Sequence, residues 1–91
     1  MTATVYSYPS IVTASISAVE AAGSVSVPGL EVGDVLLVAP VTAGSGENVG
    51  SSFEGAFERR VSVADEIQQT SGIDSGDVGD TILLVLMRGV S

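Results

Sequence analysis

The sequence predicts an all-β domain, a small β-sandwich or barrel of about six to eight short antiparallel strands. Two apolar runs, residues 35–39 and 81–87, are predicted to be the central strands. Each run follows the same phrase, Val-Gly-Asp, which is typical of a tight turn that opens a strand. Turn-forming residues recur about every eight to twelve residues between the apolar segments, as expected of a chain folded into many short strands.

The first residues are predicted to form an arm (1–10) ahead of a single β domain (11–91). Residues 2–8 are rich in β-forming types and stop at Pro9. Such an arm can pair with the edge of a sheet, either its own or that of a neighbouring copy.

Residues 11–19 alternate approximately, which predicts a strand with one buried face. The buried set is Val12, Ala14, Ile16 and Ala18. A helix over residues 14–22 is the competing interpretation, because Ala and Glu20 favour it. The β-branched and Ser content favours the strand.

Residues 24–27 alternate again, and Pro28-Gly29 predicts the next turn. The strand over residues 35–39 then ends at Pro40. Because this strand and the one at 81–88 are almost wholly apolar, both are expected to be buried on both faces.

Residues 41–52 predict a polar loop long enough to be a contact surface. Residues 53–63 predict a strand with Phe57, Arg59, Val61 and Val63 on one face, followed by a turn. Residues 67–70 predict a polar edge strand, and residues 71–80 a loop. Phe53 and Phe57 are either core residues or an exposed anchor, and their scarcity favours the core.

The repeated Val-Gly-Asp phrase has two explanations, a duplicated half-domain or turn chemistry that arose twice. Gly supplies a positive φ and Asp bonds to nearby backbone, which favours the second explanation. The predicted structural turn residues are Gly29, Gly33, Asp34, Gly79 and Asp80.

Charge limits the partners of this chain. It has 91 residues, eleven acidic side chains against three arginines, no lysine and a net charge of −8. Binding to nucleic acid or to an anionic membrane needs a basic surface, so neither is expected. A partner chosen by charge would be basic.

No enzymatic activity and no cofactor are expected. The chain has no His, Lys or Cys to activate a hydroxyl or serve as a nucleophile. Glu54 and Glu58 are the remaining candidate acid–base pair, in a chain too small for a sugar cleft. Asp74, Asp77 and Asp80 present oxygen ligands for calcium, although their spacing fits no calcium motif and favours a solvated acidic loop.

Targeting signals are not expected. The first ten residues carry no Lys or Arg, and no apolar run reaches the roughly 18 residues of a membrane span. We therefore expect synthesis in a cytoplasm.

A resemblance rests on the order of several short motifs across residues 24–88. These are the segment 27–40 (VPGLEVGDVLLVAP), Ala43-Gly44, the segment 60–65 (RVSVAD) and the closing segment 84–88 (LVLMR). In this order the chain resembles small virion proteins of tailed bacteriophages, of the head decoration (cement) or fibre-associated type. Residues 45–59 and 67–71 depart from that pattern.

The resemblance implies a non-enzymatic protein of the virion. It implies a capsid-surface location, binding to the major capsid protein, a homotrimer, and the two central strands as subunit core and trimer contact. The candidate interface residues are Thr4, Tyr6, Tyr8, Glu47, Asn48, Phe53, Arg59 and Arg60. The alternatives are a tail or head fibre module, a carbohydrate-binding β-sandwich, and an acidic inhibitor that mimics a polyanion.

Overall fold

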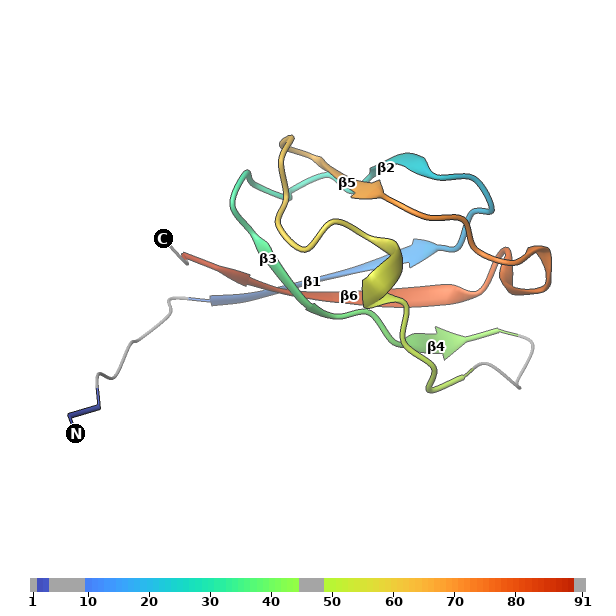
Figure 1. Cartoon of the computed structure of the whole chain (residues 1–91), viewed down its shortest axis with the longest axis horizontal. Helices are drawn as coiled ribbons and strands as arrows, with labels where there is room; N and C mark the ends of the chain where they lie inside the picture. The colour runs from blue at the N-terminus through green and yellow to red at the C-terminus, as the bar shows by residue number, and fades with distance from the viewer. Residues whose placement is uncertain (1, 4–9, 45–48, 90–91) are drawn as a thin grey trace.

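The computed structural model describes residues 2–3, 10–44 and 49–89, and this part of the chain forms six strands and two single-turn 3-10 helices in two layers (Figure 1). The all-β prediction is confirmed. The strands are β1 (Ser10–Ser17), β2 (Gly23–Ser26), β3 (Val35–Val38), β4 (Val41–Ala43), β5 (Glu66–Gln69) and β6 (Thr81–Arg88), and the 3-10 helices are η1 (Glu54–Ala56) and η2 (Ser75–Asp77).

The main sheet is built around β6. β1 pairs with it antiparallel without interruption, from Ser10 opposite Arg88 to Ser17 opposite Thr81. On its other side β6 pairs with β3 and then with β4. The register shifts between Leu36 and Val38, which marks a β-bulge at Leu37.

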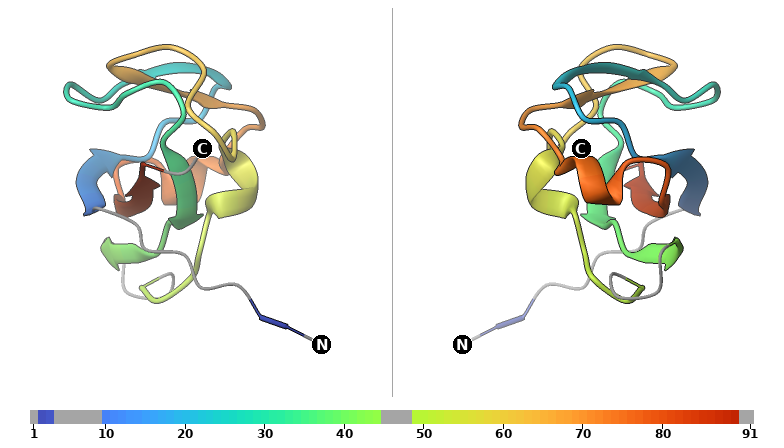
Figure 2. Two further views of the ribbon diagram at one scale, coloured as in Figure 1. Left: turned by 90° about the vertical axis from the view of Figure 1, so that its left-hand side faces the viewer. Right: turned by 90° about the vertical axis from the view of Figure 1, so that its right-hand side faces the viewer.

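The second sheet contains β2 and β5 and covers one face of the main sheet (Figures 1 and 2). The apolar core lies between the two layers. Its largest fully buried members are Leu36, Ile67, Ile82, Leu84 and Leu86. No helix in the described ranges is long and apolar enough to cross a membrane.

The strand prediction for residues 11–19 is confirmed over β1, and the competing helix is wrong. Val12, Ala14 and Ile16 pack against the core, as their alternation predicts. The predicted loop at 41–52 needs a correction, because its first three residues form β4. Val41 is buried, and the apolar side chain explains why the strand resumes directly after Pro40.

The prediction of one continuous strand over residues 53–63 is wrong. Ala56 N–H donates to Phe53 O at 2.9 Å and Phe57 N–H donates to Glu54 O at 3.4 Å, which is the bonding of a 3-10 turn and not of a strand. The chain instead makes the turn η1 and then crosses from one sheet to the other. Glu58 N–H donates to Gln68 O in β5, whereas Arg59 O accepts from Leu36 N–H in β3.

This crossing segment also corrects the prediction of an edge strand at residues 67–70. β5 pairs with β2 on one side, and Phe57 and Glu58 contact it on the other. Gln69 is therefore buried, and its side-chain amide donates to the carbonyls of Val19 and Ser71.

The two Val-Gly-Asp phrases form the same turn. Gly33 and Gly79 have φ of +97° and +90°, and Val78 has φ −61° and ψ 132°. Asp34 N–H donates to Glu31 O, and Asp80 N–H donates to Asp77 O, each at 3.1 Å. The second turn has the dihedral angles of type II, in which the third residue needs a positive φ, and the first shares its glycine conformation and closing bond.

Each turn is also bonded in the same way to a buried residue of a neighbouring segment. Gly33 N–H donates to Val61 O, and Val61 N–H donates to Asp34 O. Gly79 and Asp80 make the equivalent two bonds to Ala18. The shared geometry accounts for the repeated residues, because each phrase anchors the start of a central strand.

Alanine at Gly79 is expected to destabilise the fold by about 1–2 kcal/mol, because a Cβ disfavours this positive φ. Gly76→Ala is the matched control. A Cβ added at either glycine would meet no atom within 4 Å, but of the two only Gly79 has a positive φ. Urea unfolding of the two variants measures the effect, and equal stabilities would contradict the assigned role of the turn.

Candidate functional site: the outer face of the main sheet

The outer face of the main sheet is the side that points away from β2 and β5. Along β6, Ile82, Leu84 and Leu86 are buried, whereas Leu83 and Val85, between them, remain partly exposed. Every residue of β6 up to Met87 is uncharged. The central strand is therefore apolar on both faces, but the described residues of this chain cover only one of them.

Cross-strand pairing arranges the outer face into rows. One row joins Ile11, Met87 and Val35, and the next joins Thr13, Val85 and Val38. Further along β6, Leu83 lies opposite Ser15, and Thr81 lies between Ser17 and Ala43. The outer face thus grades from apolar at one end to hydroxyl-bearing at the other.

The bulge in β3 increases the exposed apolar area. Leu37 and Val38 are consecutive, yet they are 37% and 42% exposed, and Ile11 across the sheet is 56% exposed. The expectation that both central strands are buried on both faces is wrong for β3 and β6 in the single chain. The reason is that the second layer, made of β2 and β5, covers only one face of the main sheet, and no described segment covers the other face.

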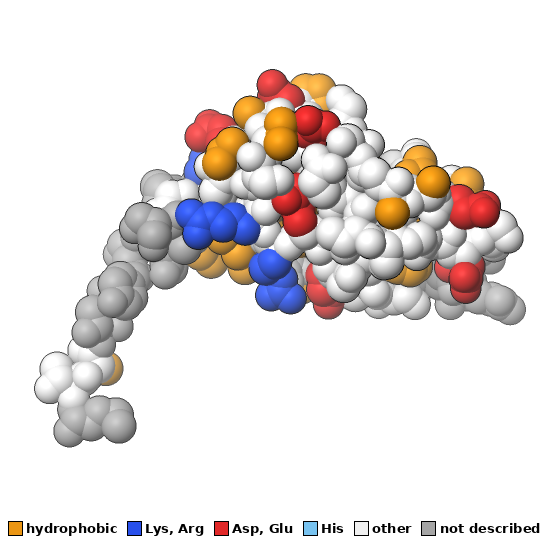
Figure 3. Space-filling view, turned by 45° about the horizontal axis from the view of Figure 1, so that its top comes forward, with side chains coloured by type: hydrophobic (Ala, Val, Ile, Leu, Met, Phe, Trp, Pro, Cys, Tyr) orange, Lys and Arg blue, Asp and Glu red, His pale blue; other side chains and the backbone are white. Residues whose placement is uncertain are grey.

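No charged side chain of the described strands lies on the outer face. β1, β3 and β4 contain no charged residue, and β6 contains only Arg88, whose guanidinium contacts Asp34 and Glu31. The opposite side of the molecule differs, because acidic side chains are scattered over it between isolated apolar ones (Figure 3). The arginines gather at one end of that view.

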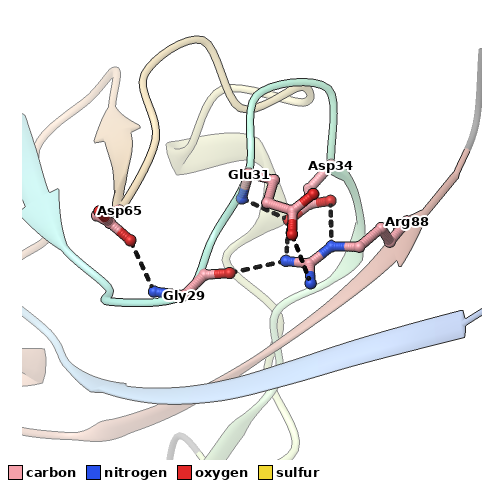
Figure 4. Close-up of polar contacts among 5 residues, drawn as sticks. All are labelled: Gly29, Glu31, Asp34, Asp65 and Arg88. Atoms are coloured by element: carbon pink, nitrogen blue, oxygen red, sulfur yellow. Dashed lines mark hydrogen bonds and ion pairs between the residues drawn. The ribbon is translucent and has the colours of Figure 1, made fainter.

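An ion pair between Asp34 and Arg88 anchors the end of β6 to the loop before β3 (Figure 4). Arg88 Nε donates to Asp34 Oδ1 at 3.0 Å, and Nη2 donates to Oδ2 at 2.9 Å. Nη2 also donates to Gly29 O at 2.8 Å, and Nη1 lies 3.2 Å from Glu31 Oε2. The bidentate geometry holds the carboxylate and the loop in one position.

The surroundings of Asp34 favour its charged form. The side-chain hydrogen bond from Arg88 lowers the pKa of Asp34 below its ordinary 3.8, and the Glu31 N–H bond acts in the same direction. Burial opposes this shift and is outweighed. The same hydrogen bond raises the pKa of Arg88.

Asp80, the counterpart of Asp34 in the second turn, has different surroundings. It is 4% exposed, and its Oδ2 has no hydrogen-bond partner in the described structure. A Cβ at Gly44 would overlap the Asp80 carboxylate, so glycine is required where β4 ends. The two turns share a backbone conformation. Among the described residues, however, only the carboxylate of the first turn, Asp34, has a cation beside it.

The candidate interface residues chosen from the sequence do not form one site. Thr4, Tyr6, Tyr8, Glu47 and Asn48 lie outside the described residues. Phe53 packs half-buried against the core and Phe57 is buried, which confirms the core interpretation of both. Arg59 and Arg60 are exposed beside β3, and Arg60 forms a bridge with Val35.

The candidate catalytic carboxylates are engaged in structural bonds. Glu54 accepts from Ala39 N–H at 3.4 Å, and Glu58 accepts from Gln68 N–H at 2.8 Å and from the Ser62 hydroxyl. In the parts of the chain that the structure describes, no pocket is found, and no group of three acidic side chains is arranged to hold a metal ion.

No protein-family model, curated protein or solved structure matches the chain. The outer face of the main sheet is the candidate functional site. Sequence reasoning placed its β3 and β6 residues in the core and the trimer contact, and it left the outer-face residues of β1 outside the buried set. The signal was present in the continuous apolar run of β6, but the sequence does not say which face lacks cover.

Asp34→Asn is expected to lower stability at neutral pH by about 1–3 kcal/mol, because charge-assisted hydrogen bonds are lost. Asp65→Asn is the control. Asp65 has φ of +65°, which Asn tolerates. The hydrogen bond that its side chain accepts from Gly29 N–H can be kept by the amide oxygen of Asn.

The loss should also depend on pH. Since the folded pKa of Asp34 is lowered, its contribution is complete above the unfolded pKa and disappears as the pH falls through the folded one. The gap between wild type and Asp34→Asn should be constant above about pH 5 and shrink below about pH 3.8. A gap that persists in acid would contradict this account.

Proposed function

We propose that this chain is a non-catalytic decoration protein that binds the exterior of an assembled tailed-phage head and stabilises it. The supporting observation is the outer face of the main sheet, which is uncharged, is apolar over its Ile11 and Val38 rows, and is covered by no segment of the described structure. Exposed apolar strands on a small domain are typical of a surface that binds another protein. The order of short motifs that resembles phage virion proteins supplies the class of partner.

The distribution of charge supports a fixed orientation on the shell. The described acidic residues lie in loops, in η1 and η2, or in β5, and none lies on the outer face. Docking through the uncharged face would leave the acidic surfaces in solvent. Like charges on neighbouring bound copies and neighbouring particles would then oppose non-specific association.

Stabilisation would follow from mass action. A subunit that binds only the assembled shell adds its binding free energy to the free energy needed to open the shell. Many identical contacts around a symmetric shell add up, so each contact can be weak. No chemical step is required of the bound chain.

The direct test is to mix the purified chain with the heads of a phage from which the gene for this chain has been deleted. Saturable co-sedimentation and new density on the shell in cryo-electron microscopy are the expected results. Absence of binding would overturn the proposal. Density at the tail tip would favour the fibre module in its place.

Val38→Asp is expected to weaken binding to these heads by about tenfold or more, because a charge replaces an apolar side chain in the contact. Val63→Asp is the matched control. The two valines are 42% and 46% exposed, but Val63 lies in the segment between Val61 and Asp65, away from the outer face. Equal loss in both variants would argue against the outer face as the contact.

A further inference from the structure

Among the described residues, the main sheet has one edge closed by its own chain and one edge to which no further segment is bonded. Beside β3, Leu36 N–H donates to Arg59 O at 2.7 Å. Beyond β3, Phe53 N–H donates to Ala39 O at 2.9 Å, and Val41 N–H donates to Ser51 O at 2.7 Å. At the opposite edge β1 pairs with β6 alone, and no other described segment bonds to it.

β1 lacks the features that normally protect an open edge. Over Ser10–Ser17 there is no charged residue and no proline, and the pairing with β6 is free of bulges. The other open edge in the described structure, β2, has four residues and is followed by Pro28. A long, regular, uncharged edge is the kind that accepts another strand.

We propose that two copies of the chain pair antiparallel through β1, about a two-fold axis perpendicular to the sheet. This inference extends the proposed function, because it would join two outer faces into one larger surface. The occupant is a second copy because the edge is self-complementary. Each β1 offers an eight-residue, bulge-free edge with no charged side chain, so two such edges can pair antiparallel along their length without placing acidic side chains of the two copies in the contact.

Geometry limits the pairing. The edge beside β3 and β4 is already bonded to residues 50–53 and 59–61, so β1 of one copy cannot add there. β1 can meet the β1 of the second copy, which gives an isologous, closed dimer. That assembly has two copies, in contrast to the trimer implied by the resemblance.

The side-chain alternation of β1 restricts the register. A two-fold axis perpendicular to the sheet keeps the outer faces of both copies on one side. Each odd-numbered residue of β1 therefore lies opposite an odd-numbered residue of the other copy, and each even-numbered residue opposite an even-numbered one. The two registers that keep the most pairs centre on Thr13, with Ser10 opposite Ile16, or on Ala14, with Ile11 opposite Ser17. In both registers the apolar rows of the two copies lie on one continuous surface.

Sedimentation equilibrium of the full-length chain is the first test. We expect a mass of twice 9.1 kDa. Thr13→Lys should raise the dissociation constant by about tenfold or more, because a lysine from each copy would approach the other across the new pair of strands. Thr42→Lys is the matched control, an exposed threonine on β4 away from this edge. It should leave the dimer unchanged.

Cysteine cross-linking tests the register. The chain has no native cysteine, so a single introduced thiol can form a disulfide only between copies. Residues that face themselves across the axis have the Cα separation that a disulfide needs. We expect one of Thr13→Cys and Ala14→Cys to cross-link on mild oxidation, and Thr42→Cys to remain monomeric on a denaturing gel.

A monomer, a trimer, a dimer that Thr13→Lys leaves intact, or a dimer in which neither cysteine cross-links would each overturn this pairing. These outcomes are separate from those of the head-binding experiment. A monomeric chain that binds heads contradicts only the β1 pairing. A β1-paired dimer that fails to bind heads contradicts only the proposed function.

Discussion

The constraint on which the structure depends is the apolar character of β6 on both of its faces. Hydrogen bonding to β1 on one side and to β3 and β4 on the other satisfies its backbone. Burial of Ile82, Leu84 and Leu86 then requires a second layer, which β2 and β5 supply. The chain has no third layer among its described residues, so the outer face stays open to solvent. This asymmetry leaves the domain with one apolar sheet face that its described residues do not cover.

The two Val-Gly-Asp turns show how one sequence device positions two different environments. In both, glycine permits the turn, and the Asp backbone bonds to a buried residue nearby. At Asp34 a bidentate arginine compensates the buried carboxylate, so the loop and the end of β6 hold each other in place. At Asp80 the carboxylate packs against Gly44 without such a partner. Backbone geometry is therefore common to both turns, whereas electrostatics is specific to each.

Local patterns predicted much of this fold. The alternation of β1, the apolar runs of β3 and β6, and the positive φ at Gly33 and Gly79 follow from residue types and short-range sterics. The segment 53–63 could not be predicted in this way. Its path from β5 to β3 is set by which backbone groups of the two sheets remain to be bonded, and that is a property of the assembled fold. The same limit applies to the Asp34–Arg88 pair, whose members are 54 positions apart.

The candidate site was harder to predict because its signal was the same as that of the core. Leu84 and Val85 are adjacent apolar residues on one strand. Only the placement of the second layer leaves Val85 partly exposed and Leu84 buried. Charge then distinguishes this face from the rest of the described surface. A chain with net charge −8 has kept charge off the whole of β1, β3 and β4 and has placed the arginine of β6 in an ion pair at the loop before β3. Close approach of another protein to this face would desolvate none of the ionised groups on the described strands, so burial of its apolar rows would contribute to binding without an electrostatic penalty from them.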